Sequence, residues 1–276
     1  MIKVKCFGSW CSDEVMLTEV IGRQVENKQN FTFGNIQFII DDYGYDYAVL
    51  MNYPNKPYDP RKSLLFQFEP KPIRNTWPKI TPWKDYSIDS GNYHMPIMWH
   101  VPIDYNYLLN DIPEKTNLFS GCFTKKISLE GHKLRMDFID NFLCNPKDQF
   151  DLFGPDEWNG FPNYKGWKPK QDTLRPYKYC FNAENYIEPL YFTEKLYDGI
   201  LCETLTFYYG CPNVDQYIDP NTFIRIDLQK PEEAKEIIKT SIANNEWEKR
   251  IGLIRAEKQR ILKETQFLAF LNKVLS

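Results

Sequence analysis

The sequence predicts an α/β protein made of two domains, and three observations lead to this prediction. Short apolar runs that read as strands alternate with segments of helical spacing in both halves of the chain, an order that favours parallel sheets with helical crossovers. A proline-rich stretch interrupts this alternation. The length of 276 residues exceeds that of a typical single domain, so we expect two domains of ordinary size around a cleft.

The first half is expected to form a parallel sheet. Strand-like apolar runs lie at residues 2–7, 36–40, 47–51 and 64–68. Between the first two runs, residues 14–24 carry apolar side chains at helical spacing. The stretch from 70 to 102 then holds six prolines and three tryptophans, which predicts loops. Loops on a rigid sheet often carry recognition, but these aromatic residues are equally suited to pinning irregular backbone onto the core.

The second half repeats the same alternation, and we place the domain boundary near residue 115. This gives domains at 1–115 and 116–276, the second including the helices at the carboxyl end. Its expected strands are 118–123, 150–153, 177–182, 205–209 and 223–226. Helical spacing occurs at 132–143, at 193–202 and in two segments between 231 and 275.

Composition excludes several functional classes. A formal net charge of -3 provides no positive field for general binding to nucleic acid. The apolar runs are too short to span a bilayer, and the first residues read as a strand and not as a signal peptide, so we expect a cytoplasmic protein. The seven cysteines form neither a CxxC pair nor a ligand-spaced cluster with histidine. We therefore expect free thiols and no metal site.

Polar residues cluster where the strand at 177–182 ends and the next helix begins. In an open parallel sheet, ligands bind beyond the carboxyl ends of the strands. A helix amino terminus presents unpaired N–H groups, and Lys195 in the first turn adds a cation that suits a diphosphate. On spacing alone, Glu194 and Lys195 are also consistent with an exposed first turn. The candidates for one site are Glu184, Asn185, Tyr191, Glu194 and Lys195.

Two segments, which follow each other in the same order as in the family, resemble the signature of α-1,3-fucosyltransferases, glycosyltransferase family ten. The family has a strand ending in Phe-Glu-Asn followed by Tyr-Val-Thr-Glu-Lys; here residues 177–185 end in Ala-Glu-Asn, and residues 191–195 read Tyr-Phe-Thr-Glu-Lys. Residues 210–214 and 219–224 are similar to its Gly-x-Pro-x-Val and Pro-x-Ser-Phe continuation. Residues 150–154 resemble its Val-Asp-x-Tyr-Gly strand. In the first half the likeness rests on strand order and on Phe68-Glu69-Pro70.

The resemblance implies a GT-B architecture, in which two Rossmann-like domains face each other across a cleft. The first would bind a glycan acceptor and the second GDP-fucose, with inversion at the anomeric carbon. By the same resemblance, Lys195 and Arg135 would neutralise the diphosphate. Asn185, Tyr191 and Glu194 would contact the ribose, phosphate or sugar. An arginine suits this task because its planar fork can hold two phosphate oxygens.

Glu69 is the candidate general base. It follows the apolar run at 64–68, so its carboxylate would stand at the carboxyl end of a first-domain strand; an exposed edge carboxylate is the open alternative. Glu194 could stabilise the positive charge that develops on the sugar ring. Because no Asp-x-Asp motif accompanies the site, we predict a reaction that needs no metal or other cofactor. A transferase for another nucleotide sugar and a non-catalytic glycan-binding protein remain the competing hypotheses.

Overall fold

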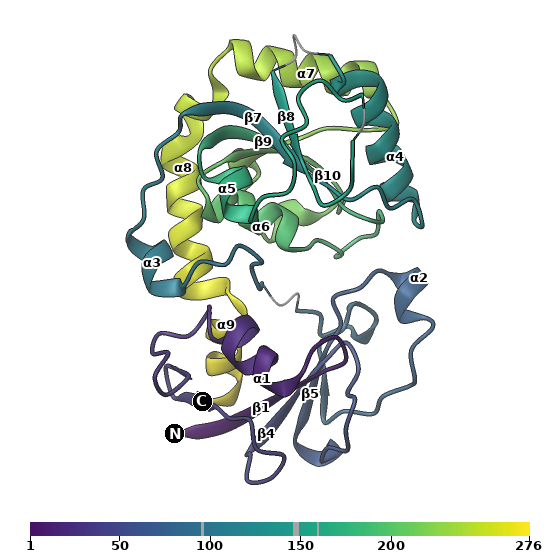
Figure 1. The fold of residues 1–276 in the computed structure, drawn as a ribbon. Helices are drawn as coiled ribbons and strands as arrows, with labels where there is room; N and C mark the ends of the chain where they lie inside the picture. The colour runs from purple at the N-terminus through teal and green to yellow at the C-terminus, as the bar shows by residue number, and fades with distance from the viewer. Residues whose placement is uncertain (95–96, 146–148, 159) are drawn as a thin grey trace. The chain divides into compact units, whose positions relative to one another are not determined.

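The computed structural model describes residues 1–94, 97–145, 149–158 and 160–276, which form two compact units. Unit 1 comprises Met1–Met98, Ile103–Asn110 and Ile261–Ser276. Unit 2 comprises Trp99–Pro102 and Asp111–Arg260. Each unit is built around one sheet that carries helices (Figure 1). The predicted α/β class is therefore confirmed in both halves of the chain.

Unit 1 contains a sheet that is parallel except at one edge. The described residues give it six strands in the order β2-β3-β1-β4-β5-β6, and only the pairing of β2 with β3 is antiparallel. The strands are β1 (Ile2–Gly8), β2 (Thr32–Phe33), β3 (Ile36–Phe38), β4 (Tyr47–Met51), β5 (Ser63–Phe66) and β6 (Lys84–Asp85). Continuous apolar runs suit these central strands, which are buried on both faces. The helix expected at 14–24 is a short α1 (Asp13–Val15) continued by the π-helical η1 (Met16–Ile21).

The remaining helical segments of unit 1 come from residues 60–110 and from the carboxyl end of the chain. They are η2 (Pro60–Lys62), α2 (Lys71–Arg74), η3 (Ile88–Ser90), α3 (Tyr105–Asn110), η8 (Ile261–Thr265) and α9 (Phe267–Leu275). Figure 1 shows α9 beside the strands of this unit. The ring of Phe267 packs edge-on against Phe66 at 5.0 Å, and that of Phe270 packs against Tyr86 at 5.2 Å.

α9 belongs to unit 1, whereas the expected division of the chain puts it in the second domain. The chain enters unit 2 at Trp99–Pro102, returns to unit 1 for Ile103–Asn110 and enters unit 2 again at Asp111, whereas a single boundary is expected near residue 115. Residues 261–276, however, were assigned to the second domain, and they pack on unit 1 instead. The physical reason is that their apolar stripe covers aromatic side chains of the first sheet, with Phe267, Leu268 and Leu271 fully buried.

Unit 2 contains an all-parallel sheet with the order β11-β10-β9-β7-β8. Its strands are β7 (Asn117–Cys122), β8 (Phe150–Phe153), β9 (Tyr177–Ala183), β10 (Leu205–Tyr209) and β11 (Phe223–Arg225). The chain starts at β7, adds β8 on one side and then crosses to β9 on the other. The order in which strands are added therefore reverses between β7 and β9. The carboxyl ends of these two neighbouring strands mark the topological switch point of the sheet, where doubly wound folds bind ligands.

Helices connect these strands and complete unit 2. They are α4 (Glu130–Phe138), η4 (Ile139–Leu143), α5 (Lys170–Leu174), α6 (Glu194–Leu201), η6 (Val214–Gln216), η7 (Pro220–Thr222), α7 (Pro231–Ala243) and α8 (Glu246–Arg260). Buried phenylalanines from β7, β8, β9 and β10 form the core, with Phe119 4.7 Å from Phe150 and 5.6 Å from Phe207. This core holds the carboxyl ends of the strands in fixed positions.

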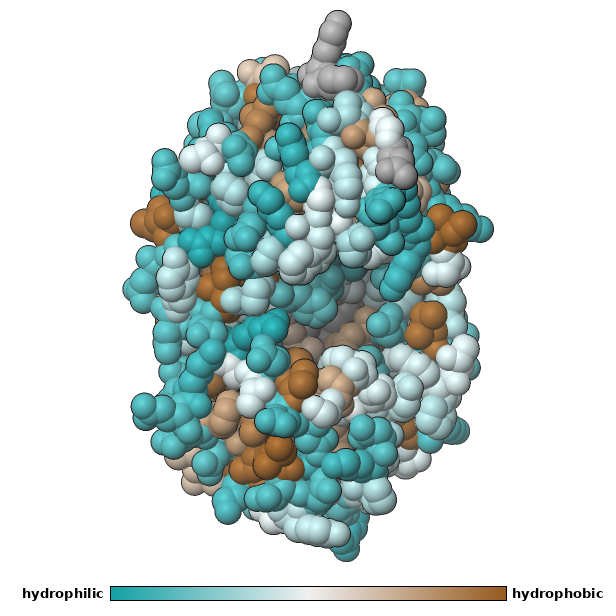
Figure 2. All heavy atoms as spheres, in the orientation of Figure 1, coloured by the Kyte–Doolittle hydropathy of each residue, from teal (hydrophilic) through white to brown (hydrophobic). Residues whose placement is uncertain are grey.

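Figure 2 shows a face on which hydrophilic residues predominate and hydrophobic ones are scattered. Among the described residues, no helix combines the length and the apolar character needed to cross a bilayer. All seven cysteines are free thiols, as expected. In the same described part of the chain, no group of three or more His, Cys, Asp or Glu side chains is placed to hold a metal ion.

Candidate functional site

The candidate site lies at the switch point of unit 2, where α4 touches the segment that follows β9. The N–H of Gly131 donates to the carbonyl of Asn185 at 3.1 Å. A Cβ atom at Gly131 would lie 2.2 Å from the Glu184 carbonyl oxygen, which is closer than any real contact. Only glycine therefore lets the helix approach the strand end this closely. This contact brings the helix that carries Arg135 to Asn185.

Arg135 is a buried cation at this switch point. Its side chain is inside the protein, with 4% of the residue exposed, and its guanidinium lies 5.4 Å from the Phe123 ring centre. It donates to Asn185 Oδ1 at 3.3 Å and to the Thr124 carbonyl at 3.4 Å. Its Nε has no hydrogen-bond partner in the described part of the chain. A buried charged group with an unused donor calls for an explanation, and an anionic ligand supplies one.

Burial lowers the pKa of Arg135 to about 10, while the carboxylate of Glu184 acts in the opposite direction. The guanidinium thus remains charged at neutral pH. Its hydrogen bond to Asn185 joins two residues that are 50 positions apart in the chain.

Glu184 is a fully buried carboxylate that connects the end of β9 to the start of α6. Its Oε1 accepts the Thr193 N–H at 2.8 Å and the Tyr208 hydroxyl at 3.2 Å. Its Oε2 accepts the Thr193 hydroxyl at 2.8 Å. Thr193 is the N-cap residue of α6, but its side chain makes no cap hydrogen bond. The hydroxyl is instead used by the stronger carboxylate acceptor, so Glu184 has a structural role in fixing the helix start.

Lys195 carries its ammonium into a group of carboxylates. The Nζ atom lies 3.4 Å from Glu184 Oε2, 3.3 Å from Glu194 Oε1 and 3.0 Å from Thr193 Oγ1. Burial lowers the pKa of Lys195, but Glu194 and Glu184 outweigh it and leave the pKa raised. A positive charge therefore stands at the amino end of α6, as predicted, and it already has anionic neighbours.

Glu194 lies among three basic side chains. Its Oε1 lies 3.3 Å from Lys195 Nζ, 3.7 Å from Lys170 Nζ and 3.9 Å from His100 Nδ1. Burial raises the pKa of Glu194, yet Lys195, Lys170 and His100 together hold it well below its usual range. Glu194 is an anion at neutral pH for this reason. Lys170 and His100 were not predicted from the sequence, because neither lies near Glu194 along the chain and neither belongs to a recognisable motif.

Tyr191 is placed less favourably for contact with a ligand. Only 1% of the residue is exposed, and its N–H donates to the Glu188 carbonyl at 3.3 Å. The structure therefore brings together Arg135, Asn185, Glu194 and Lys195 in unit 2, while it places the Tyr191 side chain in the core. A contact of Tyr191 with a nucleotide remains a prediction.

Glu69 belongs to unit 1, near the carboxyl end of β5. The strand ends at Phe66 and not at Phe68 as expected, because the chain turns into α2, whose N-cap is Pro70. Glu69 is partly exposed, and its carbonyl accepts a hydrogen bond from Arg74 Nη1 at 2.8 Å. Its assignment as a base remains a prediction.

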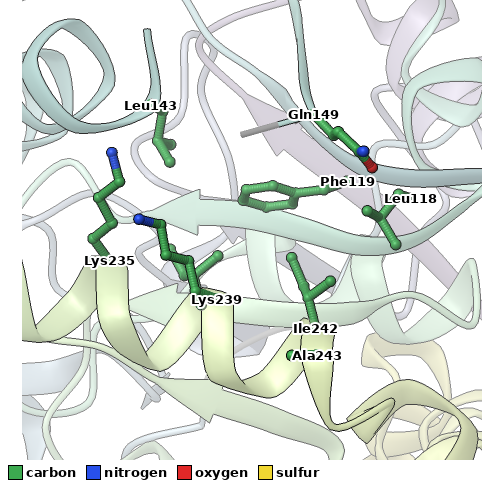
Figure 3. Close-up of a pocket in the computed structure, with 9 residues that line it drawn as sticks. Leu118, Phe119, Leu143, Gln149, Lys235, Lys239, Ile242 and Ala243 are labelled. Carbon is green, nitrogen blue, oxygen red and sulfur yellow. The ribbon is translucent and has the colours of Figure 1, made fainter. Parts of the chain in front are cut away.

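A separate cavity of about 270 Å³ opens near the amino end of β7. Figure 3 shows Phe119 in the middle of the residues that line this cavity, with Lys235 and Lys239 projecting from α7. Leu118, Leu143, Ile238 and Ile242 supply most of the remaining lining. None of the predicted site residues lines it, and it lies at the opposite end of β7 from the switch-point site. The predicted site residues of unit 2 lie at the switch point instead.

Comparison with known proteins found a likeness in fold. No protein-family model and no curated protein matches this chain. A solved α1,3-fucosyltransferase matches with 17% identity and a TM-score of 0.56, covering 91% of this chain and 80% of the other. An α1,3-fucosyltransferase structure with GDP-fucose has 17% identity and a TM-score of 0.54, covering 95% and 90%.

A glycosyltransferase from Rickettsia africae has 12% identity and a TM-score of 0.51, covering 99% of this chain and 96% of its own. These matches extend over nearly the whole chain and include both units. The chain therefore has the GT-B fold of these glycosyltransferases, and the α1,3-fucosyltransferases among them agree with the resemblance seen in the sequence.

Proposed function

We propose that this protein is an inverting glycosyltransferase that moves fucose from GDP-fucose to a hydroxyl group of a glycan. One observation carries the proposal. At the switch point of unit 2, the buried Arg135 has an Nε with no partner in the described part of the chain, beside Asn185 and the cationic start of α6. Two cations and a helix amino terminus at a strand end suit a diphosphate.

The choice of donor rests on the resemblance in sequence and on the structural neighbours. Solved α1,3-fucosyltransferases of the same fold hold GDP or GDP-fucose. In this proposal, Arg135 and Lys195 neutralise the diphosphate and Asn185 contacts the nucleotide or the sugar. Lys195 would exchange contacts with Glu184 and Glu194 for contacts with phosphate oxygens, which are equally good acceptors for its N–H donors.

The proposed reaction is a single displacement. Glu69 accepts the proton of the acceptor hydroxyl, whose oxygen attacks the anomeric carbon as the bond from that carbon to the β-phosphate oxygen breaks. The electron pair leaves with GDP, and Arg135, Lys195 and the first N–H groups of α6 stabilise its growing charge. Glu194, held ionised, stabilises the positive charge on the sugar ring. The role of these cations predicts full activity in the presence of EDTA.

Incubation with GDP-fucose and a panel of N-acetyllactosamine-type and simpler glycans tests the proposal. We expect fucose transfer by the wild-type protein, loss of transfer with intact GDP binding in Glu69→Gln, and GDP binding at least tenfold weaker in Lys195→Ala and Arg135→Ala, on the order of one charge-assisted hydrogen bond. Lys133→Ala, an exposed change on the same helix as Arg135, is the matched control.

Ligand selectivity separates the proposal from its competitors. A thermal-shift series with GDP, UDP, GDP-fucose and GDP-mannose reports binding because a ligand of the folded state raises apparent stability. A shift with UDP alone would identify a different nucleotide-sugar transferase. Binding of glycans without turnover of any donor would instead identify a glycan-binding protein.

A further inference from the structure

Asp198 is a fully buried carboxylate on α6, one helical turn beyond Glu194. Residues four apart lie on the same face of a helix. Its Oδ1 accepts the backbone N–H of His100 at 2.9 Å. Its Oδ2 lies 2.6 Å from the Nζ of Lys170, the first residue of α5. This short contact fixes the Lys170 ammonium, because a buried carboxylate without a cation would be strongly unfavourable.

The fixed ammonium of Lys170 also reaches Glu194. Its Nζ lies 3.7 Å from Glu194 Oε1, the same oxygen that Lys195 contacts from the other direction at 3.3 Å. Two ammonium groups on different elements thus share one carboxylate oxygen. The two differ in their other carboxylate partner: Lys170 lies 2.6 Å from Asp198, and Lys195, at the start of α6, lies 3.4 Å from Glu184.

We propose that Lys170 is a positioning residue for Glu194: anchored by Asp198, its ammonium holds the Glu194 carboxylate in place when Lys195 turns to the donor diphosphate. The inference rests on the proposed function, since it assumes a diphosphate at Lys195. Without Lys170, binding of the donor would remove the main counter-ion of Glu194 at the step where its negative charge is needed. With Lys170, one cation serves the phosphate and another serves the carboxylate.

The basic side chains facing Glu194 come from three parts of the chain. Lys195 belongs to α6, Lys170 to α5, and His100 to the segment 99–102. Burial of Glu194 opposes the effect of these groups on its pKa. Loss of Lys170 therefore removes one of the two ammonium groups beside Glu194 and raises the pKa of Glu194. The acidic limb of the pH profile for kcat should move to higher pH.

Two variants test this role, so that misfolding of one of them does not decide the result. Lys170→Met leaves Asp198 without its cation and is sensitive to misfolding, whereas the double variant Lys170→Met/Asp198→Asn leaves no unpaired buried charge, and the Asn oxygen can still accept the His100 N–H. We expect kcat to fall at least about tenfold in both, with the GDP dissociation constant changed less than about threefold. Lys170→Arg should restore most of kcat. Lys168→Met, an exposed change two residues away, should match the wild type.

A second readout does not require turnover. In protein with ¹³C-labelled glutamate carboxyl groups, the Glu194 resonance is the one absent from Glu194→Gln. Its titration midpoint should rise in the double variant, with and without GDP, and stay unchanged in Lys168→Met. An unchanged midpoint in the double variant, or an equal loss of GDP binding and kcat, would overturn the proposed role. A raised midpoint in a protein that transfers no sugar would support the link to Glu194 and reject the proposed function instead.

Discussion

Glu184 and Thr193 are joined by two hydrogen bonds of 2.8 Å, one from the Thr193 N–H to Oε1 and one from its hydroxyl to Oε2. These bonds close the loop between β9 and α6. Within this loop Leu190 adopts a φ of 68°, a left-handed conformation that costs a non-glycine residue about 1 kcal/mol or more. The Leu190 N–H donates to Asn213 Oδ1 at 2.8 Å, so side chains on both sides of the loop hold it in this conformation.

Glu184→Gln should destabilise unit 2. The amide cannot accept two hydrogen bonds from Thr193 and one from Tyr208 as the carboxylate does, and it leaves Lys195 with one anionic neighbour fewer. The expected loss in the free energy of unfolding is about 3 kcal/mol, as for other broken buried networks, measured by urea denaturation. Glu114→Gln, at an exposed position of the same unit, should change it by less than about 0.5 kcal/mol. A similar small change in both variants would contradict the structural role of Glu184.

Gly131→Ala should disrupt the switch-point site. The added methyl group would meet the backbone carbonyl of Glu184 at 2.2 Å, so α4 has to move away and take Arg135 with it. We expect GDP binding to weaken at least about tenfold, the effect of one lost charge-assisted contact, measured by isothermal titration calorimetry.

Gly252→Ala is the matched control for this change. Gly252 lies within α8, and a Cβ atom there would have no neighbour within 4 Å. Because alanine is the better helix former, this substitution should raise the free energy of unfolding by about 0.5–1 kcal/mol and leave GDP binding unchanged. Equal GDP binding in both variants would show that α4 does not position the site.

The local part of the site could be predicted from the sequence. The apolar run of β9 ends at Ala183 and α6 begins at Glu194, close to the expected positions. Strand ends and helix starts can be predicted in this way because they depend on residues that are close together in the sequence. The parallel order of the strands follows from the same alternation. This places Asn185 and Lys195 at the carboxyl edge of the second sheet without knowledge of any tertiary contact.

The rest depends on contacts between distant parts of the chain. Nothing in the sequence shows that Gly131 must touch the Glu184 carbonyl or that Lys170 reaches Asp198, because such pairs leave no periodic signal. The apolar stripe of α9 predicts that this helix is buried but does not say on which sheet. The likeness between β9–α6 and a known signature identified the most informative segment, and the structure adds Lys170, Asp198 and Gly131 to it.

His94 should make unit 1 less stable in mild acid. Its ring stacks on Phe270 with centroids 3.4 Å apart, and burial lowers its pKa to about 4. Because an unfolded histidine has a pKa near 6.5, its contribution is fully present above pH 6.5 and is lost as the pH falls towards 4, at up to about 1.4 kcal/mol per pH unit. His94→Phe should reduce this pH dependence in urea titrations between pH 4 and 7.

A second histidine adds an acid sensitivity of its own. His132 on α4 also has a pKa lowered to about 4, by burial and by Arg135, so some acid sensitivity of unit 2 should remain in His94→Phe. An unchanged slope in His94→Phe would mean that its ring is not buried in the neutral form.

Phe267→Ala should destabilise unit 1 and spare unit 2. The ring is fully buried against Phe66, and removing it leaves a cavity that typically costs about 3–5 kcal/mol. Hydrogen exchange measured by mass spectrometry should show faster exchange in β4 and β5 and unchanged exchange in β9 and β10. Lys273→Ala, exposed on the same helix, should change neither. Faster exchange in β9 and β10 alone would show that α9 packs on unit 2, as the predicted domain 116–276 implies.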